Sequence, residues 1–206
     1  MRKRTRQTIE PYGEAIQHLQ RLLKRAQRAG LSQPTAASLA TVDSLGRPSV
    51  RMVLLKEVRE RGVVFYTNLQ SRKGRQLALN PRVALCWFCD PLKQQVLIEG
   101  RVEAVSDEEA DAYWASRPRK TQVGGWASLQ SRTLPRRQQL EARFAKYERR
   151  FRARKVPRPA YWSGYRVIPH RIEFWKARPF RLNERILYQR LYAQSGDRWT
   201  VSLLYP

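Results

Sequence analysis

The chain alternates repeatedly between short apolar segments and turn-forming residues, a pattern typical of β-strands. Segments 37–43 and 49–55 flank the turn-rich stretch Ser44–Pro48, which predicts a β-hairpin. Further strand-like segments lie at 62–67, 83–88, 95–105, 165–168, 171–175, 186–192 and 199–204. Seven or more short strands with few helices predict an antiparallel, mainly β barrel with peripheral helices.

Four segments carry helix signals. Residues 14–29 place apolar side chains on one face of a helix, and residues 71–77 predict a short second helix. Ser106 and Glu109 have the spacing of a capping box, which predicts a helix that runs to about residue 115. Residues 134–152 predict a strongly basic helix. These helices are expected at the edge of the barrel.

Composition narrows the class of protein further. Hydrophobic residues make up 42% of the chain, enough for a core despite a formal net charge of +24. No stretch approaches the roughly 18 apolar residues of a membrane-spanning helix, and the basic N-terminus lacks the apolar region of a secretory signal. No linker or repeat is visible. We expect one cytoplasmic domain over residues 1–206, in which residues 1–30 form a basic segment and a helix, with no membrane partner.

Positive charge is concentrated at the N-terminal tip and between Arg132 and Arg158. The latter stretch holds eleven Lys and Arg residues beside two acids, Glu141 and Glu148. Such a stretch attracts polyanions through counterion release. No helix-turn-helix, zinc-finger or RNP-type pattern accompanies it. We therefore interpret it as a solvated helix face and do not expect nucleic acid as a partner.

Cys86-Trp-Phe-Cys89 has the spacing of redox and metal motifs. A thioredoxin-type pair lies at a helix N-terminus, whereas this pair ends an apolar strand, where residues three apart point to opposite faces. Zinc would need two further ligands, and the histidines His18 and His170 are isolated. We interpret the pair as ordinary buried thiols and expect no metal.

The segment from Tyr66 to Lys73 carries the clearest local binding signal. A strand ends in an aromatic and a hydroxyl side chain, and Ser71, Arg72 and Lys73 then form the first turn of a helix. Backbone N–H groups at a helix N-terminus together with two cations make a natural phosphate site. This pattern favours a phosphorylated ligand.

Six blocks of the sequence occur in order between about Leu31 and the C-terminus. They are residues 51–56, 64–73, 80–83, 116–119, 172–175 and 181–185. Together, and with their approximate spacing, they resemble the signatures of the pyridoxamine 5′-phosphate oxidase family. The resemblance implies an FMN-binding split β-barrel, which agrees with the strand pattern found independently.

The resemblance also implies a function. Members of the family are homodimeric FMN-dependent oxidases that hold FMN at the subunit interface. They convert pyridoxamine or pyridoxine 5′-phosphate to pyridoxal 5′-phosphate, with oxygen as acceptor and hydrogen peroxide released. Hydride transfer belongs to the cofactor, so the protein mainly positions and tunes it. That division of labour explains why no obvious acid–base pair appears in the sequence.

Site residues follow from the resemblance by position. Those assigned to FMN are Arg51, Met52, Val53, Leu54, Leu55, Lys56, Tyr66, Thr67, Arg72, Lys73, Gln95, Gln130, Ser131, Trp175 and Arg185. Those assigned to the substrate are Lys56, Tyr113, Arg117, Thr121, Arg181 and Asn183, of which Arg181 and Asn183 are the candidate catalytic pair. Both ligands carry phosphate, which Arg and Lys clusters bind. Position 183 is Asn where the family usually has His.

Two other functions stay open at this stage. The first is that of a related split-barrel flavin oxidase, which would act on another reduced ring compound such as a dihydrophenazine acid. Such a substrate has no phosphate, so the residues assigned to the substrate phosphate argue against it: Lys56, Tyr113, Arg117 and Thr121. The other is a basic nucleic-acid-binding module. Flavin absorbance of the purified protein would separate the enzymes from that module.

Overall fold

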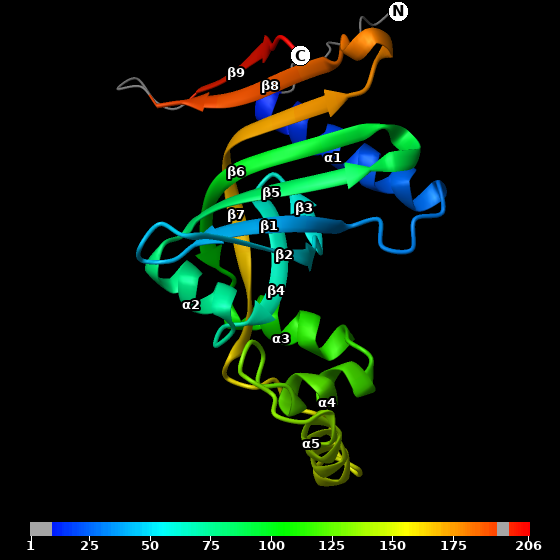
Figure 1. The fold of residues 1–206 in the computed structure, drawn as a ribbon, viewed down its shortest axis with the longest axis vertical. Coiled ribbons are helices and arrows are strands. Elements are labelled where there is room, and N and C mark those ends of the chain that lie inside the picture. Colours follow the sequence, from blue (N-terminus) through cyan, green and yellow to red (C-terminus); the bar gives the residue numbers. More distant parts are fainter. Residues whose placement is uncertain (1–9, 193–197) are drawn as a thin grey trace, which may run out of the picture.

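One antiparallel sheet of nine strands forms the centre of the part of the chain that the structure describes, residues 10–192 and 198–206 of the computed structural model. The strands are β1 (Ala36–Val42), β2 (Pro48–Leu54), β3 (Glu57–Arg59), β4 (Gly62–Asn68), β5 (Arg82–Cys89), β6 (Gln94–Ala104), β7 (Trp162–Lys176), β8 (Glu184–Leu191) and β9 (Arg198–Leu203). The main strand order is β2-β1-β5-β6-β7-β4-β3, and β8 and β9 extend from β7. The sheet curls into an open half-barrel (Figure 1), which confirms the predicted fold class.

The hairpin and most of the other predicted strands are confirmed, but residues 165–168 and 171–175 lie on a single strand, β7. The prediction of two strands was wrong because Pro169 and His170 looked like a break. In the structure, Pro169 lies opposite Gly100, where a bulge shifts the β6–β7 register. A bulge tolerates a residue that has no N–H to donate. The first part of β7 pairs with β4 and the last part with β8.

Five α-helices surround the described sheet. They are α1 (Pro11–Arg28), α2 (Arg72–Leu79), α3 (Asp107–Ser116), α4 (Arg119–Ala127) and α5 (Arg137–Arg150). Four were predicted, although the basic helix begins at Arg137 and ends at Arg150 rather than spanning 134–152. The sequence did not predict α4, which contains Gly124 and Gly125, residues that disfavour helices. A Cβ at Gly125 would lie 2.8 Å from the Trp114 ring, so packing explains the second glycine.

Two larger hydrophobic cores and a small third cluster of Val64, Val105 and Ala110 hold the described elements together. The larger one joins the buried face of α1, including Ile16, Leu19 and Leu22, to the sheet. The second is aromatic and joins α3, α4 and the C-terminal end of α5 to the start of β7; its buried members include Trp114 and Trp162. Helix α5 itself has no buried residue, which confirms the prediction of a solvated basic face. No described helix is long and apolar enough to cross a membrane.

The predicted capping box at the start of α3 is present. Ser106 Oγ accepts a hydrogen bond from the Glu109 N–H at 3.2 Å, and Glu109 Oε2 accepts one from the Ser106 N–H at 3.2 Å. We expect Ser106→Ala to destabilise the protein by about 1 kcal/mol, a fall of about 2–4 °C in the melting temperature for a chain of this size. Thermal unfolding would measure it. Ser106→Asp is the control because it keeps an acceptor, and an equal loss in both variants would contradict a capping role.

Candidate active site

A cavity of about 840 Å³ opens where the ends of β2 and β4 meet helices α2, α3 and α4. Four cationic side chains line it: Lys56, Lys73, Arg117 and Lys120. No aspartate or glutamate is among the described residues of its lining. Because a concave surface with charge of one sign concentrates the opposite charge, the cavity favours an anionic ligand.

Lys73 lies on one wall of the cavity, in the first turn of α2, and only 7% of its surface is exposed. Its Nζ atom is 3.0 Å from Thr67 Oγ1, 3.3 Å from Ser71 Oγ and 3.4 Å from Gln130 Oε1. All three are neutral oxygens. Burial, and secondly the charge of Arg51, lower the pKa of Lys73 to about 8. A bound anion would supply the counter-charge that this ammonium lacks.

The local sequence explains why this lysine is held there. Ser71 caps α2, since its Oγ accepts a hydrogen bond from the Gly74 N–H at 3.2 Å. A Cβ at position 74 would lie 2.1 Å from the Leu69 carbonyl oxygen, so the tight turn from β4 into α2 requires glycine. The turn therefore directs the Lys73 side chain back toward Thr67 at the end of β4.

Arg51 supports the same region from behind the cavity. Its guanidinium donates to Thr41 Oγ1 at 2.6 Å and to Ser49 Oγ at 2.7 Å, and no carboxylate is among its hydrogen-bond partners in the described chain. Burial, then the charge of Arg72, lowers the pKa of Arg51 below its usual value. Two cations with neutral partners, Arg51 and Lys73, thus lie close to α2. The sequence pattern predicted a phosphate site here from Arg72 and Lys73, and that site stays a prediction.

The opposite part of the cavity is built around Arg117, at the end of α3. The guanidinium carbon lies 4.8 Å from the ring centroid of Trp162 and 5.1 Å from that of Trp114. One guanidinium nitrogen, Nη1, is buried without a hydrogen-bond partner among the described residues. Burial lowers the pKa of Arg117 below its usual value. A buried, unpartnered donor on a cation is a second position where an anion would fit.

The structure brings many of the predicted residues together around this cavity. Those that line it are Met52, Val53, Leu54, Lys56, Tyr66, Thr67, Lys73, Tyr113, Arg117, Thr121 and Gln130. Arg51, Leu55, Arg72 and Ser131 are neighbours in sequence but do not line it. Arg72 is exposed, which separates it from the buried Lys73 beside it.

A second group of predicted residues lies far from the cavity within the same chain. Gln95 pairs with Trp175 across β6 and β7, and Trp175 pairs with Arg185 across β7 and β8. Trp175 follows the cavity residue Trp162 by thirteen positions on one strand, and a straight strand of that length spans roughly 40 Å. Figure 1 shows β8 at one end of the molecule and α4 near the other. One chain therefore holds two separate groups.

The candidate catalytic pair lies close to the second group, in and after the β7–β8 connection. Phe180 and Arg181 both have positive φ, at 59° and 60°, an arrangement that is costly for side chains other than glycine. Asn183 Oδ1 accepts a hydrogen bond from the Arg178 N–H at 3.1 Å, so it helps to close this loop. Arg181 is exposed. Neither residue lines the cavity of its own chain.

Several cavity residues were not found from the sequence. They are Asn68, Ser116, Pro118, Lys120, Gly124, Gly125, Ser128 and Trp162. Lys120 directly precedes the predicted Thr121, so its position was a usable signal. Trp162 gave none, because a tryptophan at the start of a strand reads as ordinary core. The Cys86 and Cys89 thiols are free; Cys89 is buried and Cys86 is half-buried on the other face of β5.

An antiparallel half-barrel with a cationic cavity at its rim places the chain in the split-barrel class. PhzG from Burkholderia lata 383, solved with tetrahydrophenazine-1-carboxylic acid, superposes with a TM-score of 0.87 at 32% identity, covering 98% of this chain and 99% of that one. A pyridoxamine 5′-phosphate oxidase-related, FMN binding protein from Nostoc punctiforme PCC 73102 shares the fold, with a TM-score of 0.72 at 18% identity, covering 97% and 100%.

Sequence comparison narrows the class to one family. Residues 23–151 match the family model of pyridoxamine 5′-phosphate oxidase, and residues 162–206 match the pyridoxine 5′-phosphate oxidase C-terminal dimerisation region. The pyridoxine/pyridoxamine 5′-phosphate oxidase of Myxococcus xanthus strain DK1622 is 51% identical, covering 94% of this chain and 92% of the relative. That of Rubrobacter xylanophilus is 50% identical, covering 94% and 87%. The chain belongs to the pyridoxamine 5′-phosphate oxidase family.

Proposed function

We propose that the protein is an FMN-dependent oxidase that converts pyridoxamine or pyridoxine 5′-phosphate to pyridoxal 5′-phosphate, with oxygen as acceptor and hydrogen peroxide released. One observation carries the proposal. The cavity holds two cations from different elements, the buried Lys73 and the half-buried Arg117, whose Nη1 atom is buried. Neither has a carboxylate partner in the described chain. Two such positions match two phosphate groups, one on the cofactor and one on the substrate.

The residues around Lys73 fit the phosphate of FMN. Lys73, with Thr67 and Gln130 beside its ammonium, would hold that group, and Arg51 adds charge from behind. When bound, FMN would accept the hydride from the substrate, and oxygen would then reoxidise the flavin. Because the described lining of this wall holds no carboxylate, the buried ammonium is free to interact with the phosphate.

The residues around Arg117 fit the phosphate of the substrate. Arg117, Lys56, Tyr113 and Thr121 offer a guanidinium, an ammonium, a phenol and a hydroxyl along one side of the cavity. The Lys56 ammonium lies 5.8 Å from the Tyr113 ring centroid, so the two side chains are close neighbours. Their work is to bind and orient a phosphorylated ring with its reacting carbon facing the cofactor.

A homodimer would complete the site. The second group, Gln95, Trp175, Arg185 and the nearby Arg181 and Asn183, lies too far along β7 to reach the cavity of its own chain. We infer that each protomer is a single domain and that this group meets the partner's cavity. The match of residues 162–206 to a dimerisation region supports a dimer.

The proposed activity is tested directly. The purified protein should show flavin absorbance near one FMN per chain, and it should release peroxide with either B6 phosphate under air. A protein that carries full FMN and acts on neither B6 phosphate would overturn the proposed substrate but keep the flavin.

The likeness to PhzG over nearly the full length of both chains favours a second candidate, an oxidase of reduced phenazine carboxylic acids. The same assay with tetrahydrophenazine-1-carboxylic acid separates the two. We expect the B6 phosphates to be preferred, because the two cations of the substrate side, Arg117 and Lys56, suit a dianionic phosphate better than a single carboxylate.

Arg117→Ala is expected to raise KM for pyridoxamine 5′-phosphate by at least about tenfold, since it removes a charge-assisted contact worth about 1.5–3 kcal/mol. The FMN content should stay normal, because Arg117 lies away from the Lys73 position. Steady-state kinetics and flavin absorbance measure both effects. Arg149→Ala, on the solvated helix α5 and outside the cavity, is the matched control. Lost FMN with unchanged KM would reverse the assignment.

A further inference from the structure

Trp162, the first residue of β7, lines the substrate side of the cavity, although it lies outside the six blocks that carried the resemblance in the sequence. Its indole and that of Trp114 meet at 66° with centroids 4.8 Å apart. The Arg117 guanidinium packs in the corner between them, 4.8 Å and 5.1 Å from the two centroids. Two aromatic rings thus contact a single cation inside the cavity wall.

An arginine can be held in place by a carboxylate or by aromatic rings, and the two differ in what they leave free. A carboxylate would hold Arg117 more firmly, but it would occupy the N–H donors and neutralise the charge. A ring face attracts the cation through its quadrupole and leaves those donors free. The unpartnered, buried Nη1 of Arg117 shows this result. The indoles therefore keep the guanidinium in place and leave its buried Nη1 donor available for an anion.

The same indole also contacts the next phosphate-binding side chain. The rings of Trp162 and Tyr113 are nearly parallel, at 9°, with centroids 6.0 Å apart. Trp162 also stacks on Tyr66, at 5.5 Å and 5°. Its one ring system therefore lies against both Arg117 and Tyr113, and it fixes the spacing between a guanidinium and a phenol.

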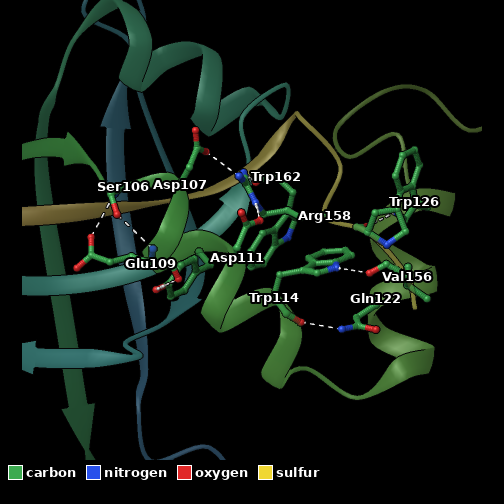
Figure 2. A network of polar contacts seen from close by, with 12 residues as sticks. Ser106, Asp107, Glu109, Asp111, Trp114, Gln122, Trp126, Val156, Arg158 and Trp162 are labelled. Carbon is green, nitrogen blue, oxygen red and sulfur yellow. Dashed lines mark hydrogen bonds and ion pairs between the residues drawn. The ribbon is translucent and has the colours of Figure 1, made fainter. Parts of the chain in front are cut away.

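Polar contacts hold Trp162 and its neighbours rigidly (Figure 2). Arg158 Nη1 donates to the Trp162 carbonyl at 2.9 Å, and the same guanidinium pairs with Asp107 and Asp111 of α3. The Trp114 indole N–H donates to the Val156 carbonyl at 2.9 Å. The start of β7 is thereby tied to the helix that carries Tyr113 and Arg117.

We propose that Trp162 is a positioning residue for the substrate phosphate: it acts through Arg117, and secondly through Tyr113, to make the site selective for phosphorylated over unphosphorylated B6 compounds. The inference rests on the proposed function, since it takes the phosphate of the substrate as the ligand of Arg117. It assigns no contact with the reacting atoms to Trp162.

The test measures phosphate selectivity by binding. Isothermal titration of the FMN-loaded dimer with pyridoxal and with pyridoxal 5′-phosphate gives two dissociation constants. The selectivity ratio is the dissociation constant of pyridoxal divided by that of pyridoxal 5′-phosphate. Trp162→Leu should lower that ratio at least tenfold, and Trp162→Phe, which keeps one ring, should lower it less. Trp126→Leu is the matched control: Trp126 belongs to the same aromatic core and packs at a tilt against Tyr147 and Phe151, but among the described residues it makes no ring contact or hydrogen bond with Arg117 or Tyr113.

A double-mutant cycle separates positioning from general loosening of the fold. In the Arg117→Ala background, Trp162→Leu should change the ratio by less than about threefold, because the group through which it acts is gone. A full tenfold effect in that background would overturn the inference, as would an equal loss in Trp126→Leu. If Trp162→Leu does not fold, the same cycle run with Trp162→Phe decides.

The two proposals fail in different ways. If the parent protein binds pyridoxal as tightly as its phosphate ester, the proposed phosphate site fails, and the role of Trp162 fails with it. If the parent is selective but Trp162→Leu and Trp162→Phe keep its ratio, the proposed function stands and only the role of Trp162 is overturned.

Discussion

Lys73→Met is expected to weaken FMN binding by at least about tenfold. Methionine keeps the length and apolar stem of lysine, so the change removes the charge with little loss of packing. A charge-assisted contact contributes about 1.5–3 kcal/mol, and 1.4 kcal/mol is already tenfold in affinity. Titration of the apoprotein by quenching of flavin fluorescence measures the dissociation constant.

Arg72→Met is the matched control for that prediction. Arg72 is the adjacent cation, but it is exposed and does not line the cavity. Solvent screens its charge, so we expect a clearly smaller loss of affinity. Equal losses in the two variants would show that the phosphate lies outside the cavity, near the surface of α2.

The pKa of Lys73 makes the same site sensitive to pH. In the free protein this pKa is about 8, lowered by burial and by Arg51, and a bound phosphate raises it. FMN binding is therefore strongest below pH 8 and weakens as the pH rises above it, by up to tenfold per unit. Titrations between pH 7 and 9.5 measure the trend. Lys73→Arg should flatten it, since arginine stays charged throughout this range; an unchanged slope would contradict the role of Lys73.

Leu203→Asp is expected to convert the protein to a monomer that no longer retains FMN. Leu203 on β9 is 80% exposed, and Phe180 and Tyr205, which also belong to the matched dimerisation region, are 93% and 94% exposed. Exposed apolar side chains gathered in one region indicate an interface. A buried aspartate there would have no partner for its charge. Sedimentation and flavin absorbance measure the two effects.

Leu45→Asp provides the comparison for the dimer prediction. Leu45 is 73% exposed in the β1–β2 turn, outside the dimerisation region, so the same substitution should leave the dimer and its FMN intact. A Leu203→Asp monomer that still binds FMN tightly would show that one chain suffices for the site. A Leu203→Asp dimer with full FMN would place the interface elsewhere.

Local chemistry explains what could be predicted from the sequence. The β1–β2 hairpin, the Ser106 capping box and the Ser71 cap of α2 each depend on residues within a few positions of one another. The basic character of α5 is likewise visible in its own residues. Most of the predicted site residues that line the cavity lie within recognisable blocks, whereas Tyr113, Thr121 and Gln130 were placed by their position relative to those blocks. A cation cluster beside a helix start already indicated a phosphate.

Tertiary contacts explain what could not be predicted. Pro169 ends a strand by local rules, and only the bulge at Gly100 on the facing strand lets β7 continue. Gly125 disfavours α4 until the Trp114 ring occupies the space beside it. The difference between buried Lys73 and exposed Arg72 depends on how β4 turns into α2. These three features follow from elements that lie far apart in the sequence or from the packing between them.

The length of β7 has a mechanical consequence in the proposed dimer. Its first residue, Trp162, lies beside the substrate position of one site, and Trp175, near its other end, belongs to the group that completes the partner's site. Each site is therefore attached to the other by two such strands, one from each protomer. A displacement at either end is carried along a hydrogen-bonded strand, whose pairing with β6 shifts register at the Gly100–Pro169 bulge. The two active sites of the dimer would thus be mechanically coupled through β7, and a substitution at the bulge would disturb both at once.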